Sequence, residues 1–337
     1  MRGEILKRLR HAVIPYSICA LLCVSAMASD ELIPMGEAVG IRVTVDGILV
    51  ADLAEAADGT AASPAQKAGV KAGDIITALN GMPVDSAAEL SEAVSELGEG
   101  EAELTVLRGG REIAMTVTPE EGPDGAPHLG LWLRDGITGI GTVTYLDPET
   151  GQFGALGHGV NDPKTGRQIT AVGGGVMTCR VAKVAPGRKG APGELQGTFS
   201  PAQSIGKIEK NCAAGIFGVL TPEQTVGEAL PVASLAQVRP GPAKILSNVR
   251  DDEVRSFSVN VLKIDPTDRA GRNYLLQICD EELLACTGGI VQGMSGSPIV
   301  QDGRLVGAVT HVLVDDPTIG YGISIGTMLE AAYAAGT

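Results

Sequence analysis

Apolar and polar positions alternate over short stretches of the chain, and Gly- or Pro-containing turns separate these stretches. Residues 40–50 alternate on both sides of Asp46-Gly47, a pair that favours a tight hairpin turn. A second alternating pair of stretches spans residues 103–117 around Gly109-Gly110. The pattern therefore predicts two β-hairpins in the first third of the chain.

One segment of this part has helical periodicity instead. Over residues 86–97, Leu90 and Val94 recur at helical spacing, and Ser86 precedes them as an N-cap. Together with the hairpins, this helix predicts a compact mixed domain over residues 34–118. The polar segment 119–128 that follows has three prolines and no periodicity, which indicates a linker.

Short strands with turns every 8 to 12 residues continue over residues 129–337, which favours a β-barrel or β-sandwich. Composition agrees, because 46 Gly and 19 Pro among 337 residues supply many turns. The protein is therefore predicted to be mainly β. Its net charge of −14 argues against a nucleic-acid surface, because phosphate contacts need a basic face.

The first 29 residues differ from the rest. A basic start is followed by the uncharged stretch 12–28, which ends in Ala26-Met27-Ala28, a small-x-small pattern that signal peptidases cut. We expect a signal peptide or a membrane anchor helix, with the remainder exported across the cytoplasmic membrane. The four histidines and the four cysteines of the exported part lack metal-ligand spacing, so neither a metal nor another cofactor is predicted.

Residues 293–298, GMSGSP, carry the strongest chemical signal. Glycines on both sides of a serine let the backbone turn so that two N–H groups point at one spot. This arrangement predicts Ser295 as a nucleophile, with the amides of Gly293 and Ser295 as an oxyanion hole. An ordinary β-turn is the alternative interpretation.

A serine nucleophile needs a base and a group that orients the base. His158 lies between glycines after a predicted strand and is the candidate base, whereas His311 lies in an apolar strand and is expected to be a core histidine. Asp280, at a strand end, leads the candidates for the acid. Spacing alone leaves the other aspartates between His158 and Ser295 open, among them Asp265 and Asp268.

Residues 63–84, SPAQKAGVKAGDIITALNGMPV, resemble the most recognisable stretch of a PDZ domain. The resemblance implies a groove for an extended peptide end between the strand near Val39 and the helix 86–97. The expected peptide-binding residues are Met35, Gly36, Glu37, Ala38, Val39, Leu90 and Val94. The alternative is that this strand edge only packs against the next domain.

Residues 139–159, 205–218 and 279–323 resemble the SpoIVB peptidases, the stage IV sporulation protein B family. The resemblance covers nearly the whole exported chain and implies a PDZ domain followed by a chymotrypsin-like double β-barrel. It places the family's catalytic triad on His158, Asp280 and Ser295. The short interval from Asp280 to Ser295 departs from trypsin-like enzymes but agrees with the SpoIVB pattern.

The same resemblance implies a signalling protease of sporulation. Such an enzyme cleaves the exposed part of a membrane-bound regulator between forespore and mother cell, which leads to activation of a late sigma factor. It also cleaves itself near its N-terminus, and its PDZ domain holds the substrate or a second copy. The alternatives are an HtrA-like envelope quality-control protease, which carries its PDZ domains after the protease domain, and a non-catalytic PDZ scaffold.

Overall fold

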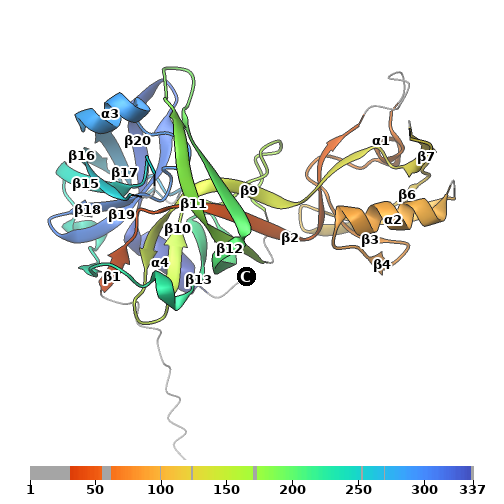
Figure 1. The fold of residues 1–337 in the computed structure, drawn as a ribbon, viewed down its shortest axis with the longest axis horizontal. Helices are drawn as coiled ribbons and strands as arrows, with labels where there is room; N and C mark the ends of the chain where they lie inside the picture. Colours follow the sequence, from red (N-terminus) through yellow and green to blue (C-terminus); the bar gives the residue numbers. More distant parts are fainter. Residues whose placement is uncertain are drawn as a thin grey trace, which may run out of the picture.

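The structure is a computed structural model of the full chain. It describes residues 31–54, 62–98, 100–122, 124–169, 173–251, 253–268 and 270–334. The expected signal peptide or anchor helix, residues 1–29, lies outside the described residues. No helix within the described ranges is long and apolar enough to cross a membrane. The protein is mainly β, as predicted (Figure 1).

Six strands close the first barrel. The pairing of β9 with β2 completes a ring in the order β9-β10-β13-β12-β11-β2. The strands of this ring are β2 (Ala38–Leu53), β9 (Leu131–Leu146), β10 (Gln152–Ala155), β11 (Gly173–Ala185), β12 (Glu194–Cys212) and β13 (Gly215–Leu220). Two short strands, β1 (Glu31–Pro34) and β14 (Leu230–Pro231), extend this sheet beyond β9.

The second barrel is formed by the C-terminal part of the chain. Its closed order is β15-β16-β17-β20-β19-β18. The strands are β15 (Gly241–Ser247), β16 (Arg255–Ile264), β17 (Tyr274–Ile278), β18 (Pro298–Gln301), β19 (Arg304–Leu313) and β20 (Asp316–Ser324). Helix α3 (Glu281–Thr287) follows β17, helix α4 (Ile325–Tyr333) follows β20, and the short 3-10 helices η1 (Pro222–Gln224) and η2 (Leu235–Gln237) connect the barrels.

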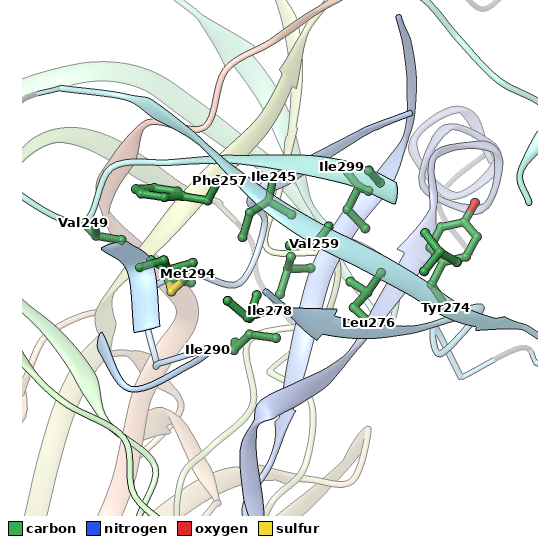
Figure 2. Packing of buried hydrophobic residues seen from close by; sticks show 14 of the residues in the cluster. Ile245, Val249, Phe257, Val259, Tyr274, Leu276, Ile278, Ile290, Met294 and Ile299 are labelled. Atoms are coloured by element: carbon green, nitrogen blue, oxygen red, sulfur yellow. The ribbon is translucent and has the colours of Figure 1, made fainter. Parts of the chain in front are cut away.

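Alternating apolar residues of these strands fill the second barrel. Ile245, Val259 and Leu276 are almost fully buried and come from three neighbouring strands (Figure 2). Each side chain of this kind stabilises the fold by about 1.5–3 kcal/mol through burial. This packing fixes β18, which begins at the last residue of the GMSGSP segment, and β19, whose Val309 and Thr310 carbonyls accept hydrogen bonds from that segment.

The PDZ domain forms a separate lobe, on the right in Figure 1. Its elements are α1 (Pro64–Ala68), β3 (Ile75–Leu79), β4 (Met82–Pro83), α2 (Ala87–Leu97), β5 (Ala102–Arg108), β6 (Arg111–Val117), β7 (Glu120–Glu121) and β8 (Pro127–His128). Ser86 caps α2 by accepting a hydrogen bond from the amide of Glu89, as the sequence predicted. The predicted hairpin over residues 103–117 is also confirmed, as β5 and β6.

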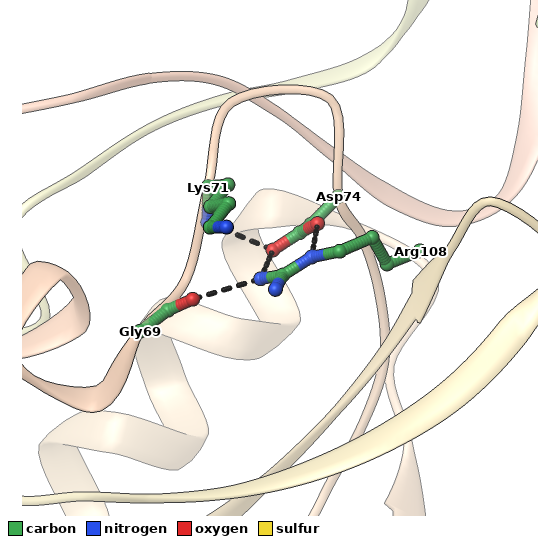
Figure 3. A network of polar contacts seen from close by, with 4 residues as sticks. All are labelled: Gly69, Lys71, Asp74 and Arg108. Atoms are coloured by element: carbon green, nitrogen blue, oxygen red, sulfur yellow. Dashed lines mark hydrogen bonds and ion pairs between the residues drawn. The ribbon is translucent and has the colours of Figure 1, made fainter.

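A buried ion pair holds the loop between α1 and β3 against β5. The carboxylate of Asp74 accepts hydrogen bonds from Arg108 Nε and Nη2, both 2.6 Å long, and from the amide of Lys71 (Figure 3). Arg108 Nη2 also donates to Gly69 O. Because Asp74 is 1% exposed, this bidentate pairing is what makes its charge tolerable in the PDZ core.

The other expected hairpin, residues 40–50, is not formed. Strand β2 runs without interruption through Asp46-Gly47, and both of its halves pair with β9. Gly47 instead lies at an irregularity, where the register shifts between Thr44 and Leu49. Its φ of 109° requires glycine, and a Cβ there would lie 2.2 Å from Ile76 O.

The two lobes therefore share strands, and the expected domain boundaries differ from those in the structure. Residues 38–44 of β2 pair with β9 and β11 inside the first barrel, whereas residues 48–53 belong to the PDZ sheet. The PDZ domain is thus an insertion within the barrel rather than a unit over 34–118. The expected linker 119–128 contains the β7–β8 hairpin.

Candidate active site

A cavity of about 570 Å³ lies where the two barrels meet. From the first barrel it is lined by His158 and by residues of β9, and from the second barrel by Gly293, Ser295 and His311. The structure therefore brings the predicted nucleophile and the predicted base to one pocket. It does so although 137 positions separate them in the sequence (295 − 158).

The Ser295 loop is fixed by backbone contacts to both barrels. Thr142 of β9 donates from its amide to Ser295 O and from its hydroxyl to Gly293 O, at 2.9 and 2.7 Å. Gly296 donates to Val309 O, and any Cβ at Gly296 would lie 2.0 Å from Thr142 O. Only glycine fits there, which explains the glycine after the serine. The Ser295 hydroxyl is half-buried and donates to the carbonyl of Thr310 at 2.7 Å.

The amides of Gly293 and Ser295 are oriented by the carbonyls of their own peptide groups. Gln292 O accepts from the amide of Leu195, and Met294 O accepts from the amide of Ser297. In a trans peptide the N–H points opposite to the carbonyl. The Gly293 and Ser295 amides therefore point away from these partners, and no described residue accepts a hydrogen bond from either of them.

His158 follows β10 at a turn in which Leu156 and Gly157 both have a φ of 69°. Its Nδ1 atom lies 2.9 Å from Gly159 O. Because a carbonyl only accepts, Nδ1 carries the proton and Nε2 is left as the hydrogen-bond acceptor. Burial lowers the pKa of His158 below its usual value, although the hydrogen bond to Gly159 opposes this effect. The imidazole is consequently neutral at physiological pH.

The segment after His158 is held by Asn211, a residue that the sequence did not single out. Its side-chain carbonyl accepts from the amide of Val160, and its side-chain amide donates to Val160 O and Ile169 O. Asn211 lies near the end of β12, and nothing in its local sequence distinguishes it from a turn residue. It fixes the backbone beside Gly159, and hence the carbonyl that orients His158.

The expectation that His311 is a core histidine is wrong. Its strand, β19, lies at the cavity, and the side chain is exposed rather than enclosed among apolar residues. The His311 ring is tilted by 40° against the His158 ring, with 5.0 Å between the centroids. The pKa of His311 falls to about 4 because partial burial, His158 and Arg272 all disfavour its charged form.

The structure does not place Asp280 beside His158. Asp280 is the N-cap of α3, where its carboxylate accepts from the amides of Leu283 and Ser258 at 3.1 Å each. It is not among the residues that line the cavity. A strand end followed by an acidic residue is also the pattern of a helix N-cap, and here the capping interaction holds the side chain. Asp265 and Asp268 likewise accept hydrogen bonds within their own turn.

The expected peptide groove near Met35 to Val39 is absent. Ala38 and Val39 are 1% exposed, and β2 pairs there with β9 on one edge and β11 on the other. The Met35 and Gly36 amides are bonded to β9, and Gly36 O accepts from Asn248. Because both strand edges are occupied, no peptide can add to this part of the chain.

A groove of about 550 Å³ exists elsewhere on the PDZ domain, between α2 and residues 127–133. Leu90 and Val94 line this groove, and the facing strand is the start of β9, with Leu131 and Leu133. Trp132 also lines this groove and is 65% exposed.

Within the described residues, no group of three or more His, Cys, Asp or Glu side chains is arranged to hold a metal ion. Among the residues that the structure describes, Cys179, Cys212, Cys279 and Cys286 form no disulfide. The cavity presents the Ser295 hydroxyl, two imidazoles and the two amides of the Ser295 loop.

Comparisons with known proteins give family matches for both parts of the chain. The family description "SpoIVB peptidase S55" matches residues 125–329, and "PDZ domain" matches residues 55–108. A probable periplasmic serine endoprotease DegP-like of Pseudomonas savastanoi is 39% identical over 85 residues, which is 25% of this chain and 16% of that protein. Serine protease HTRA1 of Xenopus laevis is 42% identical over 59 residues, which is 18% of this chain and 12% of that protein.

Solved structures give weaker similarities. The Rv3671c protease of Mycobacterium tuberculosis in its active form has a TM-score of 0.33 and 14% identity, over 60% of this chain and 76% of that one. The thermostable serine protease AL20 of an extremophilic microorganism has a TM-score of 0.35 and 14% identity, over 59% and 92%.

Proposed function

We propose that Ser295 and His158 are the nucleophile and general base of a peptidase site. The chain belongs to the SpoIVB peptidase S55 family, because the family match spans residues 125–329, which are 205 of its 337 residues. The observation that carries the proposal is the cavity. It holds the Ser295 hydroxyl, the His158 imidazole and two unpaired loop amides, contributed by both barrels.

The geometry supports acyl transfer by the following steps. The Ser295 hydroxyl leaves the Thr310 carbonyl and donates its proton to Nε2 of the neutral His158 as Oγ attacks the scissile carbonyl. The amides of Gly293 and Ser295 stabilise the resulting oxyanion. His158 then returns the proton to the leaving amine, and a water molecule hydrolyses the acyl-enzyme by the same path.

The orienting role that a carboxylate has in other serine peptidases is taken here by the Gly159 carbonyl, which fixes the tautomer of His158. The neutral His311 ring supports the imidazole from the side. No direct hydrogen bond joins Ser295 and His158 in this structure, and such contacts commonly tighten only when a substrate is bound.

Labelling with a fluorophosphonate probe tests the assignment. We expect the wild-type protein to label, and both Ser295→Ala and His158→Ala to lose labelling by at least about 100-fold. Ser297→Ala is the matched control, since Ser297 lies two positions away and its side-chain hydroxyl bonds to the Ser247 hydroxyl rather than to a group of the proposed site. Equal labelling of the wild-type protein and Ser295→Ala would refute the assignment of Ser295 as the nucleophile.

For the biological role, we propose an exported signalling endopeptidase of sporulation that cleaves a membrane-associated regulator and also itself. The basic and apolar N-terminal sequence and the periplasmic DegP-like relatives support export. The family description supports the role in sporulation. Mass spectrometry of the exported wild-type protein and of Ser295→Ala is the test. Termini present only in the wild type indicate self-cleavage, and identical termini would argue against it.

A further inference from the structure

One strand, β9, connects the PDZ groove to the catalytic cavity. Leu131 and Leu133 line the groove, and Thr138 and Ile140 line the cavity. Thr142, two residues further, bonds directly to the Ser295 loop. The same strand therefore borders the two places where a polypeptide can bind.

One edge of β9 is open between these two places. Over residues 131–142, β9 pairs with β2 on one edge, and its pairings with β1 and β10 begin only at Val143. No other described strand pairs with it before that point. Because Val143 donates to the carbonyl of Glu37, the residue just before β2, the alternation of antiparallel bonding turns the backbone groups of Ile140 and Thr138 to the open edge.

The PDZ half of the strand presents its backbone to the same side. Ala54 donates to Gly130 O, so in this part of β9 the backbone groups of the even-numbered residues bond to β2. The backbone groups of Leu131 and Leu133 therefore point toward the groove. The register shift near Thr44 accounts for the change from odd to even residues on the open edge. Both halves thus offer unpaired N–H and C=O groups to an added strand.

The start of β9 is suited to a carboxylate. Gly130 has a φ of 71°, and successive amides around such a residue form a concave anion-binding nest. No described residue accepts a hydrogen bond from the amides of Leu129 or Gly130. The groove beside them is lined by Leu90, Val94 and Leu131, so it fits an apolar terminal side chain.

We propose that the substrate is a polypeptide whose free, apolar C-terminus binds at residues 129–131 and whose preceding residues pair along the open edge of β9 to Ser295. A chain anchored at the start of β9 runs antiparallel to the strand, so its upstream residues lead toward the cavity. At about 3.3 Å per residue, the path from Leu131 to Thr142 is about 36 Å long. The scissile bond therefore lies about ten residues before the C-terminus.

One contact lies on this path. The amide of Ala87, at the start of α2, donates to the side chain of Asp135 on β9. Both residues are solvent-accessible, so a peptide leaving the groove toward Ser295 replaces this hydrogen bond with its own backbone pairing.

The inference rests on the proposed peptidase function and is tested with the full chain and defined peptides. Unstructured 20-residue peptides ending in Leu are incubated with the protein, and mass spectrometry locates the cleaved bonds. We expect cleavage about ten residues before the terminus. Removing three C-terminal residues, with Leu restored at the new end, should move the cut by three residues. Amidation of the C-terminus should slow this cleavage by at least about tenfold, because tethering is lost.

A pair of variants isolates the groove. Ser91 is exposed and lines it, whereas Ser95, one turn later on α2, is exposed and does not. In Ser91→Trp, the position of cleavage should no longer depend on the distance to the C-terminus of the peptide. In Ser95→Trp, this dependence should remain, and both variants should retain probe labelling of Ser295. If the wild-type protein labels but cleaves at positions unrelated to the C-terminus, or does not cleave these peptides, the peptide-path inference is wrong and the peptidase proposal stands. Loss of both labelling and cleavage in the wild type refutes the peptidase proposal as well.

Discussion

Replacement of Asp280 by Asn separates a catalytic role from a structural one. An Asn in place of a triad aspartate selects the wrong histidine tautomer and lowers turnover by about 10⁴-fold. In this structure, however, Asp280 caps α3, and Asn is about as good an N-cap as Asp. We therefore expect Asp280→Asn to change kcat/KM by less than about threefold and to leave Tm close to the wild-type value.

Asp280→Ala supplies the complementary measurement. It leaves the amides of Leu283 and Ser258 without their 3.1 Å partner, and loss of such a cap costs about 1–2 kcal/mol. Tm should fall by a few degrees, while the rate of probe labelling per folded molecule stays unchanged. Labelling kinetics and thermal unfolding of the same samples separate the two effects.

The pH dependence gives a further check. Burial acts to raise the pKa of Asp280, but hydrogen bonds from backbone amides outweigh it, so its pKa lies below the usual value. A carboxylate with a lowered pKa stabilises the fold above its unfolded-state pKa, near 4, and loses this contribution as the pH falls further. The stability gap between wild type and Asp280→Ala should therefore shrink below about pH 4. A drop of more than about 100-fold in kcat/KM for Asp280→Asn, at unchanged Tm, would refute the capping interpretation.

Three further expectations concern other parts of the molecule. Because burial lowers the pKa of His158, the acid limb of the kcat/KM profile should have its midpoint below about pH 6.5; a midpoint above 7 would contradict this. Gly293→Ala should reduce probe labelling by at least about 100-fold without unfolding the protein. Position 293 has a φ of 97°, and an added Cβ would lie 3.0 Å from Leu195, so the alanine shifts the amide of residue 293 away from the oxyanion. Unchanged labelling would argue against the proposed oxyanion hole. Arg108→Met should destabilise the PDZ domain by about 3 kcal/mol, because it leaves the Asp74 charge buried and unpaired, while probe labelling persists; calorimetry with an unshifted PDZ transition would contradict it.

The local elements with strong signals were predictable from the sequence. Helix α2 begins after the Ser86 cap, and the β5–β6 hairpin turns at Gly109-Gly110 as expected. Ser295 and His158, which border one cavity in the structure, drew attention in the sequence because glycines that permit unusual backbone angles surround them. Signals of this kind are local, so they survive without knowledge of the tertiary structure.

Features that depend on distant pairing were not predictable. Asp46-Gly47 favours a hairpin, but pairing of both halves of β2 with β9 outweighs that preference. The apolar strand around His311 gave no sign that one of its faces borders a cavity. The position of Asp280 at a strand end fits a catalytic acid and a helix cap equally well, and only the hydrogen bonds of its carboxylate distinguish the two.

The insertion of the PDZ lobe between paired strands has a consequence for protein engineering. Thr44 and Gly136 are cross-strand partners, so the chain leaves and re-enters the barrel at points about 5 Å apart. A short turn of about two to four residues can join them, and the lobe becomes an exchangeable cassette whose removal spares the barrel's own strands. Excision of residues 34–118 instead removes strand β2 from the barrel ring, so inactivity of such a truncated protein would report a broken barrel and say nothing about peptide docking.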